Sequence, residues 1–191
     1  MDISDNELIA RKVARFQRVA NGITSTPNFS TLFIVESSRG GFGVYSRDAV
    51  TNNLKFKEFV SINGHGDNIH FDNQGYISSD EWGQSQLVIG AHPNIIHLTQ
   101  DVKGIRKAAS WILSARPVKD GVKEKEDPRG AKAEKLYRAR NYKESWNVRT
   151  EVQDDGEWFR SATGAAIDHS RGVMIGTGLY DDHGAFLCRK K

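Results

Sequence analysis

The chain has one cysteine, Cys188, among its 191 residues. A single thiol excludes an internal disulfide and any zinc site built on cysteine ligands. The sequence also lacks an apolar run of about 18 residues, which excludes a transmembrane helix. Its first residues, Met1–Glu7, are acidic and polar and lack the basic start and apolar centre of a secretory signal. We therefore expect a soluble protein with no signal peptide in this chain; its compartment stays open, and so does whether Met1 is the natural start.

Several catalytic motifs are absent as well. The sequence has no nucleophile-elbow serine, no HExxH zinc motif, no phosphate-binding P-loop and no Rossmann glycine pattern. The net charge is only +3, and basic residues are concentrated between Lys119 and Arg149, where ten Lys or Arg face six Asp or Glu. A mixed-charge segment of this kind is typical of a solvated insertion. We therefore expect no nucleic-acid partner.

What the sequence does contain is a short polar step that occurs three times. The three copies are Ala20-Asn21-Gly22-Ile23, Gly66-Asp67-Asn68-Ile69 and Ala162-Thr163-Gly164-Ala165. An apolar, strand-like run follows each copy, in the order Leu32–Glu36, Leu87–Gly90 and Val173–Thr177. A second such run comes next in each case, in the order Phe42–Tyr45, Asn94–Leu98 and Ala185–Cys188. Repetition over tens of residues is the mark of a solenoid or a propeller.

Long helical periodicity is absent, so the predicted class is all-β. Repeated four-stranded units favour a β-propeller over a sandwich, and three units amount to about three blades of a six-bladed ring. We predict one partial propeller domain over residues 1–191, with a charged insertion at about 118–149 that holds a loop or a short helix near Ala131–Asn141. The alternation in Lys12–Val19 favours a strand. A tight turn is expected at Asp72–Gly75, and the last repeat is expected to begin near Phe159.

The repeats also suggest a metal site. In a propeller, equivalent positions of successive blades converge on the central axis, so Asn21, Asp67 and Asn68 are expected to point toward one place. One carboxylate and two amide oxygens suit Ca²⁺ and suit zinc or copper poorly. The third copy offers only Thr163 here, so the predicted cage is incomplete. The alternative for each residue is turn chemistry, in which its side chain satisfies nearby backbone donors.

His92 is the histidine whose position carries an argument. It lies in Gly90-Ala91-His92-Pro93-Asn94, directly after a predicted buried strand. A histidine at a strand end that faces a channel can act as a general base or bind a polarised carbonyl oxygen. The alternative is a structural histidine before a proline turn.

These residues together resemble the C-terminal half of the paraoxonase/arylesterase family. The motifs that match in order are Ala20–Ile23, Asp67–Ile69, Gly90–Asn94, Val173–Thr177 and Ala185–Cys188. The resemblance covers most of the chain apart from residues 118–149. It implies a six-bladed propeller with calcium in its channel that hydrolyses aryl esters or lactones. It further implies that Asn21, Asp67 and Asn68 are ligands of the catalytic calcium, that His92 lines the active site, and that Asp67 is a base or nucleophile.

The resemblance also implies that something is missing. The family's other calcium ligands, its histidine dyad and the cysteine that pairs with the counterpart of Cys188 lie in its N-terminal half and have no match here. We therefore expect a C-terminal fragment that lacks part of the active site. Two alternatives stay open. One is a gluconolactonase-like or strictosidine-synthase-like propeller, and the other is a non-catalytic half-propeller that associates with itself through open blade edges.

Overall fold

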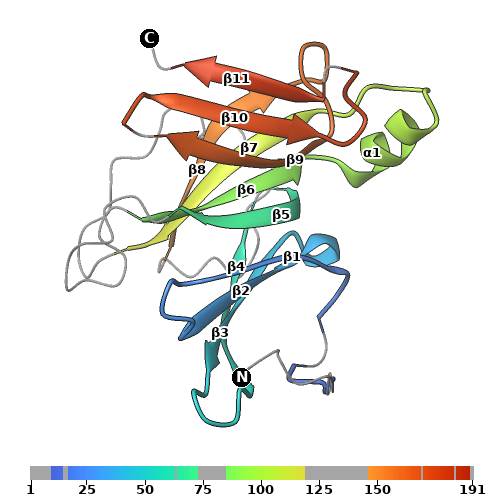
Figure 1. Cartoon of the computed structure of the whole chain (residues 1–191). Coiled ribbons are helices and arrows are strands. Elements are labelled where there is room, and N and C mark those ends of the chain that lie inside the picture. The colour runs from blue at the N-terminus through green and yellow to red at the C-terminus, as the bar shows by residue number, and fades with distance from the viewer. Residues whose placement is uncertain are drawn as a thin grey trace.

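The computed structural model describes residues 10–14, 17–62, 64–72, 85–118, 146–168, 170–182 and 184–189. Over these ranges the chain forms eleven strands in three antiparallel sheets, with one α-helix. The sheets, called A, B and C in chain order, follow one another along the molecule (Figure 1). The all-β prediction is confirmed, and none of the three sheets closes on itself within these ranges.

Sheet A is a meander in which each strand pairs with the next one in the chain. Its strands are β1 (Ala20–Ser25), β2 (Thr31–Glu36), β3 (Gly41–Arg47) and β4 (Leu54–Ser61). A 3₁₀ turn over Ser37–Arg39 connects β2 to β3 and ends at Gly40, whose φ is 68°. Glycine adopts this left-handed conformation at little cost, which explains the Gly-Gly pair at this turn.

Sheet B is built in the same way. Its strands are β5 (His65–Asp72), β6 (Gln86–His92), β7 (Ser110–Pro117) and β8 (Trp146–Asp154). Helix α1 (Ile95–Val102) lies between β6 and β7 in the chain and projects from one side of the sheet (Figure 1). Within the described ranges α1 is the only helix beyond a short 3₁₀ turn, and it is too short to span a membrane.

Sheet C has three described strands. They are β9 (Ala162–Asp168), β10 (Val173–Gly178) and β11 (Ala185–Arg189), with β10 in the middle. Its register places Ala166, Ile175 and Leu187 opposite one another across the three strands. Paired residues of a sheet share a face, so these three side chains lie on one side.

Sheet B is the centre of the molecule because it is packed on both faces. One face joins sheet A in a core that contains Phe33, Phe42, Leu87, Ile89, Leu113 and Trp146. The other joins sheet C through Val88, Ile112, Phe159, Met174 and Phe186. A strand covered on both faces needs apolar residues at successive positions. That requirement explains the unbroken apolar runs at Leu87–Ala91 and Trp111–Leu113.

The strand expected at Asn94–Leu98 is wrong, because this segment begins helix α1. The side chain of Asn94 accepts hydrogen bonds from the backbone N–H groups of Ile96 and His97, at 2.9 and 3.4 Å. This is the N-cap arrangement that starts a helix. The apolar run Ile95-Ile96 favours a strand locally, but the Asn cap after Pro93 favours the helix.

The structure bears on some of the other expectations, and the rest fall outside the described ranges. The described residues of Lys12–Val19 form no strand. Strand β8 begins at Trp146, close to the expected end of the insertion at about 149, and the first strand of the last repeat begins at Ala162, close to the expected Phe159. The turn at Asp72–Gly75, beyond Asp72 itself, and the helix near Ala131–Asn141 lie outside the described residues.

Candidate functional site

The three sequence repeats lie in the first strands of the three sheets, and each coincides with an irregularity in strand pairing. The register of β1 on β2 shifts between Ala20 and Ile23, and that of β5 on β6 shifts between Gly66 and Ile69. In sheet C the shift falls opposite Thr163, where the partners step from Gly164 to Ala162. A bulge places an extra residue in one strand and re-aims its side chain. The polar step of each repeat is therefore the bulged part of its strand.

Glycine allows the bulged strands of neighbouring sheets to touch through their backbones. A Cβ built on Gly22 of β1 would lie 2.7 Å from Cα of Asn68 and 2.8 Å from the carbonyl oxygen of Asp67, both in β5. A Cβ built on Gly90 of β6 would lie 2.3 Å from the carbonyl oxygen of Thr163 in β9. Real Cβ atoms do not approach backbone this closely. Gly22 therefore permits the close approach of β1 to β5, and Gly90 permits that of β6 to β9.

The close approach brings Asn21 and Asp67 together across sheets A and B. The Asn21 side chain is exposed and donates a hydrogen bond to the half-buried carboxylate of Asp67. Burial raises the pKa of Asp67, and the Asn21 hydrogen bond opposes that rise. A cation placed beside such a carboxylate would stabilise its charged form.

Asn68 is the exposed neighbour of Asp67 in the same bulge. Its Cβ lies 3.5 Å from the position of a Cβ built on Gly164, so the second and third repeats adjoin here. Three of the four predicted site residues, Asn21, Asp67 and Asn68, thus lie at one place where β1 and β5 meet. Sequence analysis missed the contribution of Gly90, although a glycine inside a strand is a signal of close backbone approach.

The donor set fits a hard cation better than a transition metal. Asn21, Asp67 and Asn68 supply only oxygen donors, which Ca²⁺ prefers. Across the part of the chain that the structure describes, no group of three or more His, Cys, Asp or Glu side chains could hold a metal. The cluster of Asn21, Asp67 and Asn68 is of a different kind, with one carboxylate and two amide side chains. Because Ca²⁺ takes about six to eight oxygens, three side chains leave positions for water or other ligands.

The third repeat contributes hydroxyl groups instead of amides. Thr163 Oγ1 lies 2.9 Å from Oγ1 of Thr177 and also donates to the Thr177 carbonyl oxygen at 3.2 Å. Both threonines are therefore already engaged with each other across β9 and β10. This explains in structural terms why the third repeat is the weakest ligand set of the three.

His92 lies at the end of β6 and is 3% exposed. It pairs with His65 across the sheet, and the Gly66–Ala91 pair separates it from the bulge of Asp67. Burial lowers the pKa of His92 to about 4; the nearby His65 lowers it further, while a hydrogen bond to the Ala109 carbonyl and the charge of Asp101 oppose the shift. Nδ1 has no hydrogen-bond partner among the described residues, so the Ala109 bond belongs to Nε2. His92 is therefore a neutral imidazole near pH 7, with one free lone pair.

Asp101 is a buried carboxylate that sequence analysis did not single out. It accepts hydrogen bonds from the Ser161 hydroxyl at 2.6 Å, the Ala108 N–H at 3.2 Å and the Arg160 guanidinium at 3.1 Å. These bonds tie helix α1 to the entrance of β9, just before Thr163. Nothing local in the sequence marks Asp101, because its partners lie up to 60 residues away.

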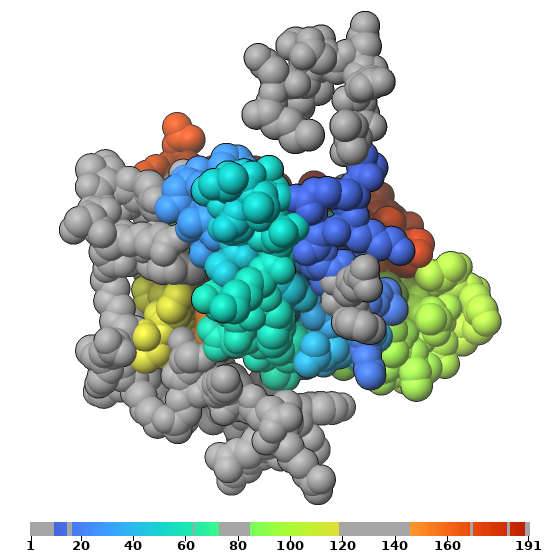
Figure 2. Space-filling model, turned by 90° about the horizontal axis from the view of Figure 1, so that it is seen from below, coloured from blue at the N-terminus to red at the C-terminus, as the bar shows by residue number. Residues whose placement is uncertain are grey.

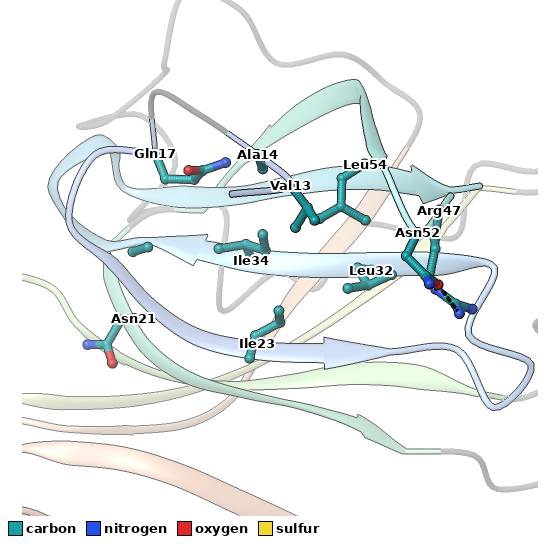
Figure 3. A pocket seen from close by; sticks show the side chains of 11 residues that line it. Val13, Ala14, Gln17, Asn21, Ile23, Leu32, Ile34, Arg47, Asn52 and Leu54 are labelled. Carbon is teal, nitrogen blue, oxygen red and sulfur yellow. Dashed lines mark hydrogen bonds between the residues drawn. The ribbon is translucent and has the colours of Figure 1, made fainter. Parts of the chain in front are cut away.

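A groove lies on the face of sheet A that points away from sheet B (Figure 3). It has a volume of about 490 Å³ and is lined mainly by apolar side chains, among them Val13, Ile23, Leu32, Ile34 and Leu54. Asn21 borders the groove at one end, and Arg47 and Asn52 border it at the other (Figure 3). The Asn21 side chain points away from the apolar residues in Figure 3, and neither Asp67 nor Asn68 lines the groove.

A scan against models of known protein families finds no match to the chain, and a search of curated proteins finds none either.

Proposed function

We propose that the chain is a calcium-dependent hydrolase of aryl esters or lactones, and that its three sheets are blades of a β-propeller. The observation that carries the proposal is that Asn21 and Asp67 meet where two bulged first strands touch, with Asn68 beside Asp67 in the same bulge. Oxygen donors from separate sheets that meet at one point are the arrangement expected of a cation site on a propeller axis.

Two features of the sheets support the propeller. Each sheet is an antiparallel meander, and the last strand of one sheet is followed in the chain by the first strand of the next. The first strands β1, β5 and β9 also adjoin, as the close contacts of Gly22 and Gly164 with residues of β5 indicate. Blades of four-stranded sheets arranged around a channel have this order. Sheets A, B and C are then three consecutive blades.

In this proposal Asn21, Asp67 and Asn68 would hold the calcium ion, which would polarise the ester carbonyl and stabilise the developing oxyanion. The raised pKa of Asp67 reflects a carboxylate partly stripped of water, and such a group is more basic toward a water molecule than an exposed one. Asp67 therefore fits the role of base or nucleophile. The positions of calcium that these side chains leave open are available to the substrate oxygen, to water or to another polypeptide.

His92 fits a lining role better than that of the principal base. With a pKa lowered to about 4, its imidazole is neutral throughout the neutral range and only weakly basic. The unpartnered Nδ1 can accept one hydrogen bond from a group that enters its surroundings. We assign His92 to the wall beside the site, one residue pair from the bulge of Asp67.

A second candidate function is a non-catalytic interaction module. The observation that favours it is the exposure of large apolar side chains on both end sheets, for example Ile23 at 59% and Leu187 at 51%. Such surfaces mark protein contacts more often than small-molecule sites. A gluconolactonase-like or strictosidine-synthase-like propeller is the family-level alternative to the arylesterase.

Calcium titration of the full chain tests the proposal most directly. Ca²⁺ should raise the thermal midpoint in a manner that EGTA reverses, because ligand that binds only the folded state stabilises it. Asp67→Asn should remove this shift. It should also leave the metal-free protein at least as stable as wild type, because burial of the Asp67 charge is unfavourable.

Activity is measured on phenyl acetate and a γ-lactone. Asn21→Ala and Asp67→Ala should each abolish calcium-dependent hydrolysis, whereas Asp155→Asn, on an exposed loop, is the matched control that should retain it. Hydrolysis retained in both site variants would refute the calcium mechanism. A calcium shift without hydrolysis of either substrate would leave the binding site intact and count for the interaction module.

A further inference from the structure

The outer face of sheet A is apolar although sheet B covers only its other face. The register aligns Leu32, Tyr45 and Phe56 across β2, β3 and β4, and Ile23 pairs with Ile34 on the same face. Ile23 is 59% exposed and Phe56 is 50% exposed, whereas Ile34 and Tyr45 between them are buried. Seen from below, residues of β3 and β4 form the surface at this end of the molecule, beside the N-terminal segment (Figure 2). We call this surface the A face.

The outer face of sheet C is apolar in the same way. Met174 and Phe186 point into the core with sheet B, so their neighbours Ile175 and Leu187 point outward. Ile175 is 50% exposed and Leu187 is 51% exposed, and the register places them side by side with Ala166. We call this surface the C face. It lies at the opposite end of the series of sheets from the A face (Figure 1).

The sequence pattern of both faces is that of covered sheets. An antiparallel sheet with one solvated face alternates apolar and polar residues along each strand. Strand β2 instead reads Leu32-Phe33-Ile34-Val35, apolar on both faces, and β10 begins Val173-Met174-Ile175. The doubly covered strands of sheet B have this same pattern. Both outer faces therefore carry the residues of a packed interface.

The two sheet contacts inside the chain show how these faces fit together. Sheet A contacts one face of sheet B, and sheet C contacts the opposite face of sheet B. The series of sheets therefore has a direction. In each contact within the chain, the face of one sheet that points toward the next sheet, called its rear, packs against the facing side of that next sheet, called its front. The A face is the remaining front and the C face is the remaining rear. Joining them repeats a contact that the chain already makes twice.

We propose that the A face of one copy of the chain packs against the C face of a second copy. A contact between two different faces is heterologous, and it closes as a ring when the rotation permits. The described part of the N-terminal segment borders the A face without filling it: the Val13 carbonyl accepts a hydrogen bond from the N–H of Leu54, and Val13, Ala14 and Gln17 line a groove of about 490 Å³. The association is independent of the proposed calcium site.

Sedimentation of the full chain over low to high micromolar concentrations tests this proposal. Wild type should associate as concentration rises. Phe56→Glu on the A face and Leu187→Arg on the C face should each weaken association about tenfold or more, because each buries an unpaired charge. Ile96→Arg is the matched control: Ile96 is 62% exposed on helix α1, outside both faces, and its substitution should change nothing.

Mixing the two face variants identifies the geometry. Each mixed pair retains one unaltered contact, from the A face of the Leu187→Arg chain to the C face of the Phe56→Glu chain, so the mixture should associate more strongly than either variant alone. A wild type that stays monomeric at every concentration would overturn the proposal. So would a Phe56→Glu defect with no Leu187→Arg defect, because that result indicates contact between two A faces. Association unchanged by both variants would indicate pairing of strand edges or another surface.

Discussion

The two titratable residues of the candidate site respond to burial in opposite directions. Burial raises the pKa of Asp67 and lowers that of His92, so in both cases the neutral form is favoured. For Asp67 a nearby cation would reverse the effect. In His92, a proton added at the buried Nδ1 finds no hydrogen-bond acceptor among the described residues. The Ala109 bond, at the other ring nitrogen, only partly offsets the cost of burying the charge. The pH dependence of stability should therefore report on His92.

We expect stability to fall as the pH is lowered from 6.5 toward 4. The folded state holds His92 neutral with a pKa of about 4, while the unfolded chain protonates it near 6.5. The stabilising contribution is thus fully present above pH 6.5 and is lost as the pH falls through the interval, on the order of 3 kcal/mol in all. Urea unfolding of wild type and His92→Gln across this range measures it.

The readout is the slope with pH rather than the absolute stability, because His92→Gln can itself disturb the core. The variant should have a flatter profile between pH 6.5 and 4. His70→Gln, which alters an exposed histidine of β5, should keep the wild-type profile. Equal slopes in wild type and His92→Gln would show that the buried imidazole does not control the transition.

At the scale of the element, the first strand of each sheet has a bulge. Beside the bulge, the strand either contains a glycine or lies against a glycine of a neighbouring sheet. The bulge turns polar side chains out of the regular alternation, and the glycine lets the next sheet approach. Gly22 and Gly164 occupy the same position in two of the repeats but have different surroundings. Backbone atoms of β5 lie at 2.7 Å from a Cβ on Gly22, whereas the nearest atom to a Cβ on Gly164 is at 3.5 Å.

Because the two glycines differ in this way, their substitutions by alanine can be compared as a matched pair. Gly22→Ala should destabilise the fold by about 2 kcal/mol, because overpacking against backbone forces sheets A and B apart. It should also weaken calcium binding, since Asn21 moves away from Asp67. Gly164→Ala, at ordinary van der Waals distance, should be tolerated. Denaturant unfolding and calcium titration of both variants measure the difference, and equal effects would contradict the assigned role of Gly22.

At the scale of the whole molecule, stability is concentrated in the central sheet. Ile89 of β6 is 0% exposed, whereas Ile23 on the A face is 59% exposed. Sheet B packs against both other sheets, so loss of a side chain there leaves a cavity that neither neighbour can fill. The end sheets each pack one face against sheet B, and the other face carries exposed apolar side chains such as Ile23 and Leu187.

The same substitution at the two positions should therefore have unequal effects. Ile89→Ala should reduce the free energy of unfolding by about 2 to 5 kcal/mol, while Ile23→Ala should change it by less than about 1 kcal/mol in the dilute chain. Chemical denaturation at low protein concentration measures both. A large loss in Ile23→Ala under these conditions would mean that the A face is already covered within one copy.

Sequence reasoning succeeded where a local pattern had one structural meaning. The apolar runs at Leu32–Glu36, Leu87–Gly90 and Val173–Thr177 are strands. It failed at Asn94–Leu98, where apolar residues suggested a strand but a cap produced a helix. It failed also at Lys12–Val19, whose alternation is real but finds no partner strand among the described residues. Pairing is a property of two segments, so one segment alone could not decide it.

The sequence by itself determined the all-β class, the three repeats and the oxygen-rich residues that they carry, because these depend on residue type and spacing along the chain. Only the tertiary structure decided that the repeats are bulges, and that Asn21 and Asp67 meet. That meeting depends on backbone contact at Gly22 between strands more than 40 residues apart. The structure also decided that His92 is buried and neutral, because desolvation arises from residues of other strands packed around the ring.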